Sequence, residues 1–408
     1  MIKMPRAAVP DYLANADDGH ATPELRFGLL LPIWSNQGWE KVEDSASKIW
    51  DKVNRLSLGD KERGAAFIKR QRGMASRLRA DSSLSIEAKS VAPFATGLGN
   101  EHPLENGFSF LNPYGLPYLP GSGVKGVVRR AAEELAGDDW GGESGWTEDA
   151  IKILFGPPAN DDHLARGALS FWDVMPQISG NGLMVEIMTP HYSHYYQQNL
   201  SDDEGPTSPH DSGQPNPISF LTVPPGSEFT FHIVYDRKRL KDAPDLGANE
   251  RWKDLLMAAF EHAFDWCGFG AKTSVGYGQM KFDVERMKKI QKEEEARKTK
   301  EAQAEAFAKK TKDLPDDAKW VEEQRANRGW EKDRGNFLSD VEALLDREQE
   351  ISCEAYKILA DEFEKMWPGI LEHPDATTQG KRPKPKFKPR QQNLAKQLKT
   401  FDPADREN

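Results

Sequence analysis

The chain of 408 residues, 38% of them hydrophobic and 29% charged, is long enough for two or three domains, and it contains neither an apolar run that would span a bilayer nor an apolar signal core after Met1. Its two cysteines, Cys267 and Cys353, exclude a disulfide framework and a cysteine zinc site, so we expect a protein of the reducing cytoplasm that carries no metal and no cofactor. The formal net charge of −10 would repel nucleic acid, so any such contact must come from local basic patches.

Residues 1–81 predict an N-terminal arm followed by helices. Residues 1–38 look irregular, except for an apolar stretch at 25–34 that is either an edge strand or an arm docked on the main core or on a neighbour. Residues 40–80 have a helical pattern, and the basic cluster in it is typical of a solvated face; it consists of Lys69, Arg70, Arg72, Arg77 and Arg79.

Residues 82–284 predict an α+β domain that begins with a half-buried strand, because Leu84, Ile86 and Ala88 alternate with polar residues. Residues 168–175 and 183–190 are two further expected strands with the turn residues 179–182 between them, and 218–223 with 228–235 are expected to form another strand pair. A long loop is expected at 197–217, and a helix at 249–266.

The first distinctive segment follows the strand at 84–88. Pro113, Pro117 and Pro120 hold the chain extended, and a G-x-G-x-x-G pattern of Gly121, Gly123 and Gly126 then leads into a helical run. A glycine loop at a helix N-terminus presents backbone N–H groups to an anion. Ser122 lies within this loop, and Lys125 and Arg129 would add positive charge, which predicts a phosphate cradle; the alternative is a tight loop whose glycines only permit sharp turns.

Three familiar nucleotide-binding loops do not fit this segment. A dinucleotide fold requires a strand directly before the glycines, where this chain has Pro117-Tyr-Leu-Pro. A protein kinase would also contain H-R-D and D-F-G motifs, which the sequence lacks. A Walker A loop requires glycine before the lysine, whereas Lys272 follows Ala271.

A second glycine segment, Gly268-Phe-Gly-Ala-Lys-Thr-Ser-Val-Gly-Tyr-Gly, follows the helix at 249–266. Its glycines permit close backbone approach, its polar residues offer one cation and two hydroxyl groups, and its tyrosine offers a stacking face. This combination suits a sugar–phosphate backbone, so the two segments could cradle one RNA strand from two sides. The predicted contact residues here are Gly268, Gly270, Lys272, Thr273, Ser274, Gly276, Tyr277 and Gly278.

No convincing catalytic set emerges from the sequence. His191 and His194 could ligate a metal, but no carboxylate or thiol close in sequence completes a site. His191 is the best candidate for a general base in RNA cleavage, with a polar loop at a strand end as the alternative. Asp81 and Asp173 are candidate acids without an identifiable partner.

The C-terminal part changes in composition. Residues 285–314 predict a charged linker or solvated helix, and residues 315–369 predict a helical extension. Residues 370–408, rich in Lys, Arg and Pro, predict a basic disordered tail. The extension either docks on a partner, with its tail holding RNA transiently, or is solvated and without function.

The two glycine segments, about 140 residues apart, together resemble the RAMP superfamily of CRISPR proteins. Within it, Gly97-Leu-Gly-Asn, Met188-Thr-Pro-His-Tyr and Pro217-Ile-Ser-Phe-Leu-Thr-Val resemble the family of the sixth Cmr subunit of type III-B effector complexes. The resemblance covers roughly residues 82–284.

This resemblance implies a ferredoxin-like (RRM-type) core with insertions. It also implies a cytoplasmic, non-catalytic subunit that binds guide RNA and caps a filament of related RAMP subunits at the 3′ side of the guide, contributing to antiviral RNA targeting. The implied partners are guide RNA, other Cmr subunits and, through the complex, target RNA, with no membrane. The competing hypothesis is a metal-independent endoribonuclease of the guide-processing RAMP type, in which His191 would act.

Overall fold

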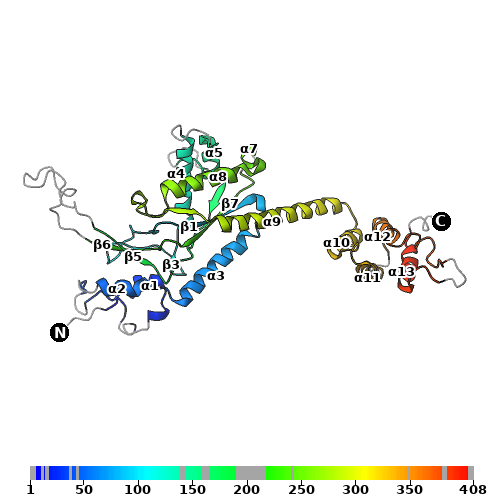
Figure 1. Cartoon of the computed structure of the whole chain (residues 1–408), viewed down its shortest axis with the longest axis horizontal. Coiled ribbons are helices and arrows are strands. Elements are labelled where there is room, and N and C mark those ends of the chain that lie inside the picture. The colour runs from blue at the N-terminus through cyan, green and yellow to red at the C-terminus, as the bar shows by residue number, and fades with distance from the viewer. Residues whose placement is uncertain are drawn as a thin grey trace, which may run out of the picture. The chain divides into compact units, whose positions relative to one another are not determined.

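The computed structural model of the chain describes residues 6–10, 13, 18–35, 39–42, 46–137, 144–158, 165–189, 217–239, 243–347, 350–378 and 384–402. The chain divides into two compact units, residues 1–298 and 299–408. Helix α9 (Val284–Thr311) runs across the boundary between them (Figure 1). Among the described helices, none combines the length and apolar character needed to cross a membrane.

The first unit is built on a four-stranded antiparallel sheet in the order β4-β7-β1-β8. The two central strands are β1 (Ser83–Ser90) and β7 (Glu228–Tyr235), and the edge strands are β4 (Leu169–Phe171) and β8 (Met280–Phe282). Helix α4 (Gly121–Ala136) lies between β1 and β4 in the sequence, and α8 (Arg251–His262) lies between β7 and β8. Mixed helices and antiparallel strands confirm the α+β class.

Side-chain alternation gives this sheet one apolar and one polar face. On the apolar face Phe231 packs against Phe260 of α8, with ring centroids 5.3 Å apart, and Ile86 is fully buried beside it in the register of β1 and β7. On the polar face Glu87 accepts a 2.8 Å hydrogen bond from Arg72. Arg72 belongs to α3 (Leu58–Ala75), so α3 covers the polar face while α4 and α8 cover the apolar one (Figure 1).

The predicted strands mostly form, but two of the predicted pairings are wrong. The turn at 179–182 does not join a hairpin, because β4 pairs with β7, and β5 (Met184–Met188) pairs with β6 (Ile218–Thr222). Strands β6 and β7 do not pair with each other either. Strand β7 lies between β4 and β1 and buries Phe229, Phe231 and Ile233 there, so burial outweighs the nearness of the turn at 224–226.

The N-terminal stretch docks on the main core. Its helices are η2 (Asp18–His20), α1 (Pro23–Phe27) and α2 (Ala46–Val53), followed by α3. Phe27, Leu31 and Ile33 are buried in the core of the first unit, so residues 25–34 form a docked arm that contains a short helix. Arg26 strengthens this docking through a 3.1 Å ion pair with buried Asp60 of α3.

The remaining elements of the first unit are short. They are β2 (Phe110–Leu111) paired with β3 (Leu116–Pro117), α5 (Glu148–Phe155), α7 (Pro244–Gly247), and the 3-10 turns at Ala80–Ser82, Ala248–Glu250 and Thr273–Val275. Thr147 caps α5 by accepting a hydrogen bond from the backbone N–H of Ala150.

The second unit is helical, with α10 (Asp316–Arg328), α11 (Arg334–Leu345), α12 (Cys353–Met366) and α13 (Pro389–Lys399) around its own core. Helix α13 lies inside the tail that was predicted to be disordered, and for residues 384–402 this prediction is wrong. Leu394 and Leu398, four positions apart, form an apolar stripe among the cations, and both are buried.

Candidate nucleic-acid interface

The first glycine segment forms the opening turns of α4 itself. Helix α4 begins at Gly121, directly after Pro120, so the predicted loop before the helix is replaced by helix. A Cβ atom on Gly121 would overlap the carbonyl oxygen of Phe171, whereas Gly126 has no atom within 4 Å of that position. Packing therefore requires glycine at Gly121, and Gly126 leaves an open surface.

The N-terminus of α4 already holds a carboxylate. The backbone N–H of Gly121 donates a 2.7 Å hydrogen bond to Oδ1 of Asp173, which supplies the partner that the sequence did not reveal for this acid. The next N–H groups, those of Ser122 and Gly123, take part in none of the hydrogen bonds of the described residues. At this helix start Ser122 is exposed and Gly123 is half-buried.

Three cations gather one turn further along α4. Half-buried Lys125 lies close to Arg129 and Arg166, and burial, followed by the charges of these two arginines, lowers the pKa of Lys125 below the usual range of lysine. Arg129 pairs with Glu133 at 2.8 Å, while no ion pair among the described residues includes Lys125. Arg166 donates to the hydroxyl of Ser170 at 2.8 Å. Such a cluster favours a bound anion, because an anion relieves the mutual repulsion of the cations.

An aromatic cavity of about 470 Å³ lies beside this helix start. Asp173 joins the two features, since it lines the cavity and accepts the hydrogen bond from Gly121. In the same cavity Arg70 stacks over the ring of Tyr114 at 5.5 Å and donates to its hydroxyl at 2.7 Å. The other lining residues are Phe67, Gln71, Met74, Phe171 and Trp172. Aromatic and guanidinium planes of this kind are surfaces on which nucleobases stack.

Sequence reasoning missed this cavity and Arg166. The residues come from α3, from the turn between β2 and β3 and from the end of β4, and no local pattern relates them. Arg70 is exposed, as a solvated basic face predicts, and it also donates a hydrogen bond to the hydroxyl of Tyr114. Only the aromatic pair Phe171-Trp172 next to a strand end could have drawn attention to the site.

The second glycine segment is a tightly folded turn. All four of its glycines, Gly268, Gly270, Gly276 and Gly278, have positive φ angles between 68° and 93°. A Cβ on Gly270 would overlap the carbonyl oxygen of Ala95. These glycines are required by backbone conformation and close packing, whatever the segment binds.

The polar residues of this segment differ in accessibility. Lys272 lies with its Nζ 3.1 Å from the sulfur of Met188 and 5.4 Å from the ring centroid of Phe220, so it is folded onto β5 and β6. The hydroxyl of Tyr277 donates to Glu186 at 3.3 Å, and burial together with this carboxylate raises the pKa of Tyr277. Ser274 is exposed and Thr273 is half-buried.

The structure does not bring the two glycine segments into one site. Cys267, which precedes the second segment, lies 3.8 Å from the carboxylate of Glu134 near the end of α4. Glu134 is about 20 Å from Gly121 along the axis of this helix. None of the hydrogen bonds, ion pairs and ring contacts of the described residues joins the two segments, so any RNA contacts they make lie at separate points of a strand.

A chemically reactive set is not evident in the part of the chain that the structure describes. His191 and His194 lie outside the described residues. His232 contacts the hydroxyl of Ser85 through Nδ1 at 2.9 Å, but its Nε2 is buried without a hydrogen-bond partner. Burial, followed by the charge of Arg72, lowers the pKa of His232 to about 4, so its imidazole is neutral at neutral pH.

Residues 87–281, which include both glycine segments and most of the sheet, match the family model of the RAMP superfamily. Over these residues, just under half of its length, the chain is similar to the RAMP superfamily. It is also similar to two curated Cmr6 proteins, which confirms the predicted resemblance. To the CRISPR system Cmr subunit Cmr6 of Pyrococcus furiosus it is 26% identical over 329 residues, covering 68% of this chain and 91% of the relative. To the CRISPR system CMR subunit Cmr6 of Saccharolobus solfataricus it is 29% identical over 199 residues, covering 48% of this chain and 55% of that relative.

Two solved structures are also similar to this chain. One is the Type III-B Cmr-beta bound to cognate target RNA, with a TM-score of 0.40 and 22% identity over 58% of this chain and 70% of that chain. The other is Cmr6 from Pyrococcus furiosus, with a TM-score of 0.26 and 21% identity over 48% of this chain and 97% of that chain.

Proposed function

We propose that this chain is a protein of the RAMP superfamily and a non-catalytic, guide-RNA-binding subunit of a cytoplasmic type III-B Cmr complex that serves antiviral RNA targeting. It caps the RAMP filament at the 3′ side of the guide, next to other Cmr subunits, and meets target RNA through the complex. Its similarity to two Cmr6 proteins supports the assignment to the complex. The observation that carries RNA binding is the cluster of Lys125, Arg129 and Arg166 at the start of α4.

The cluster suits a phosphate of single-stranded RNA. The N–H groups of Ser122 and Gly123 provide directed donors. The three cations provide charge, and water screens the half-buried Lys125 and Arg129 less than the exposed Arg166. The cavity with Tyr114 and Trp172 lies on the other side of Asp173 and is large enough for a base next to that phosphate. Phosphate contacts would position the strand, and pairing between guide and target would read the sequence.

The second glycine segment serves as a separate contact in this proposal. Exposed Ser274 and half-buried Thr273 would donate to the sugar–phosphate backbone, and Gly276, which has no atom within 4 Å of its Cβ position, would let it approach closely. Gly268, Gly270 and Gly278 would hold the turn in the conformation that presents these groups. Lys272 and Tyr277 would join them by leaving Met188 and Glu186, contacts that are weak enough for an RNA strand to replace.

The sheet supports the interpretation of the core as ferredoxin-like. The elements follow the order β1-α4-β4-β7-α8-β8, a β-α-β-β-α-β sequence, and neighbouring strands are antiparallel.

Binding of a labelled single-stranded RNA as a function of salt concentration tests the proposal. We expect Lys125→Ala with Arg166→Ala to weaken binding and to lower the slope of log Kd against log salt by about 0.7 for each lost phosphate contact. Lys288→Ala, which removes an exposed cation on α9, is the matched control and should leave the slope unchanged. An unchanged slope in the double variant would overturn the role of the cluster.

Incubation of the purified chain with repeat RNA tests the absence of catalysis. We expect intact RNA. Cleavage that disappears in His191→Ala would instead establish the endoribonuclease, and co-purification of RNA and Cmr subunits with the tagged chain tests membership of the complex.

A further inference from the structure

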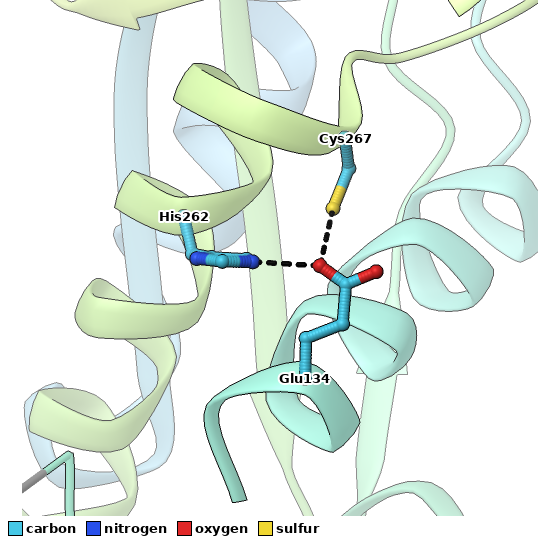
Figure 2. A group of neighbouring side chains, drawn as sticks. All are labelled: Glu134, His262 and Cys267. Carbon is cyan, nitrogen blue, oxygen red and sulfur yellow. Dashed lines mark hydrogen bonds and ion pairs between the residues drawn. The ribbon is translucent and has the colours of Figure 1, made fainter. Parts of the chain in front are cut away.

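Three side chains that could ligate a metal meet at the end of α4. The carboxylate oxygen Oε2 of Glu134 lies 2.7 Å from Nε2 of His262 and 3.8 Å from Sγ of Cys267. All three ligand atoms lie within 4.8 Å of one another. Figure 2 shows the imidazole and the thiol, both from the end of the α8 segment, pointing toward the same carboxylate oxygen.

A local change of helix type creates this arrangement. His262 ends α8, and Cys267 ends the π-helical turn Ala263–Cys267 that follows it. In a regular α-helix, residues five apart differ by about 140° around the axis and face different directions. A π turn closes i→i+5 hydrogen bonds, and the 2.8 Å bond from the N–H of Gly268 to the carbonyl of Ala263 has this spacing. The extra residue in the turn therefore brings Cys267 below His262, on the side facing Glu134.

The surroundings orient the carboxylate and leave a route for a metal ion. Arg130 donates from Nε to the other oxygen of Glu134, Oε1, at 2.9 Å, which fixes the carboxylate plane and directs Oε2 at the two other ligands. His262 is only 5% exposed, so its ring is held by packing, while Glu134 and Cys267 are half-buried and can be reached from solvent.

We propose that Glu134, His262 and Cys267 bind a divalent transition metal of the zinc class through Oε2, Nε2 and Sγ, with water as the fourth ligand. Tetrahedral zinc bonds of about 2.0–2.3 Å place neighbouring ligand atoms roughly 3.3–3.6 Å apart. The distances of 2.7 and 3.8 Å reach this geometry through small side-chain rotations. On binding, the thiol of Cys267 releases its proton to solvent, and His262 coordinates as a neutral imidazole that carries its proton on Nδ1.

The sequence predicts no metal site, because two cysteines are too few for a cysteine zinc site and no complete set of ligands lies close together in the sequence. Glu134 is separated from His262 by 128 positions, and the thiol joins through a π turn that no local pattern reveals. The site would tie the end of α4 to the residue before Gly268, and so fix the start of the second glycine segment. This proposal does not depend on RNA binding.

Titration of the metal-stripped full chain with Co²⁺, followed by displacement with Zn²⁺, tests the site. We expect one equivalent of Co²⁺ to give a thiolate-to-metal charge-transfer band that Zn²⁺ abolishes. Cys267→Ser should lose the band, and Cys353→Ser is the matched control that should retain it. Glu134→Gln should weaken Co²⁺ affinity at least tenfold, and Arg130→Ala, which removes only the group that orients the carboxylate, about tenfold.

A thermal measurement keeps the test decisive if a variant is unstable. Zn²⁺ should raise the Tm of the wild-type chain and of Cys353→Ser but not that of Cys267→Ser, because only a ligand bound to the folded state stabilises it. Absence of the charge-transfer band in the wild-type chain, or its persistence in Cys267→Ser, would show that the three side chains are only a hydrogen-bonded link between the helices.

Discussion

The N–H of Gly121 donates to Oδ1 of Asp173 at 2.7 Å, so the first donor of α4 is occupied by a carboxylate of the protein itself. Asp173 fixes the helix start against the end of β4 and also places a negative charge next to the proposed phosphate contact. The same residue therefore stabilises the fold and weakens the attraction for RNA. In the proposed function, the phosphate contact is consequently displaced from the tip of the helix toward Ser122, Gly123 and Lys125.

We predict that Asp173→Asn increases RNA affinity by a few-fold. The amide oxygen still accepts from Gly121, so the helix start is retained, while one negative charge close to the phosphate is removed. Fluorescence anisotropy with a labelled single strand measures the change. Asp149→Asn, at an exposed position in the first turn of α5, should not alter affinity, and an equal gain in both variants would point to net charge alone.

Two glycines of α4 should respond in opposite directions to alanine. Gly121→Ala forces a Cβ into the carbonyl of Phe171 and should reduce the free energy of unfolding by about 1–3 kcal/mol. Gly126→Ala meets no atom within 4 Å in an exposed helical position and should increase it by about 0.5–1 kcal/mol. Urea denaturation of the two variants measures both changes, and a loss of stability in Gly126→Ala would contradict the helical conformation of this segment.

Much of the fold could be predicted from local sequence, because the alternation of apolar and polar residues in strands and their periodicity in helices indicate directly which side chains are buried. The helix with Trp252 and Phe260 in its core stripe, the cap at Thr147 and the strand containing Ile86 all follow from such patterns. The pairing of the strands could not be predicted from these local patterns, because a turn specifies only that the chain reverses its direction. The partner of β7 is decided by where Phe229 and Phe231 can be buried, which depends on elements more than a hundred residues away.

The candidate site was only partly accessible for the same reason. Lys125 and Arg129 lie in one helix and could be found together, whereas Arg166 joins them only through the packing of the folded chain. The sequence also could not show that Gly268 to Gly278 is shaped by its contacts with residues 93–95. A glycine pattern indicates that the backbone can adopt unusual conformations. Only the structure shows whether close packing or a bound ligand requires them.

Stability should fall on acidification through His232. Burial lowers its folded-state pKa to about 4, below the value of about 6.5 in the unfolded chain, so the unfolded state binds more protons between these values. The contribution of neutral His232 to the free energy of unfolding is complete above pH 6.5. It is lost as the pH falls toward 4, and the loss amounts to at most about 3 kcal/mol. The free energy of unfolding at pH 7 and pH 5.5 should therefore differ less in His232→Gln than in the wild-type chain.

The comparison with His232→Gln is needed because another histidine acts in the same direction. Burial, followed by the charge of Lys41, lowers the pKa of His102, although a hydrogen bond to the carbonyl of Phe27 opposes this shift. The wild-type pH dependence contains both contributions, and the variant removes only one. Identical pH dependence in the two proteins would mean that His232 is accessible to protons in the folded state.

The C-terminal helix α13 should be integral to the second unit despite its basic composition. Leu398 is fully buried in the core with Phe337 and Phe363, so Leu398→Ala should reduce the stability of this unit by about 2–5 kcal/mol. Gln397→Ala is the matched control. The side chain of Gln397 is next to Leu398 in the sequence but is exposed, so its removal should change stability by less than about 0.5 kcal/mol. Hydrogen exchange of the amides of α11 and α12 reports the effect on this unit alone. Equal protection in the two variants would mean that the packing of Leu398 does not stabilise α11 and α12.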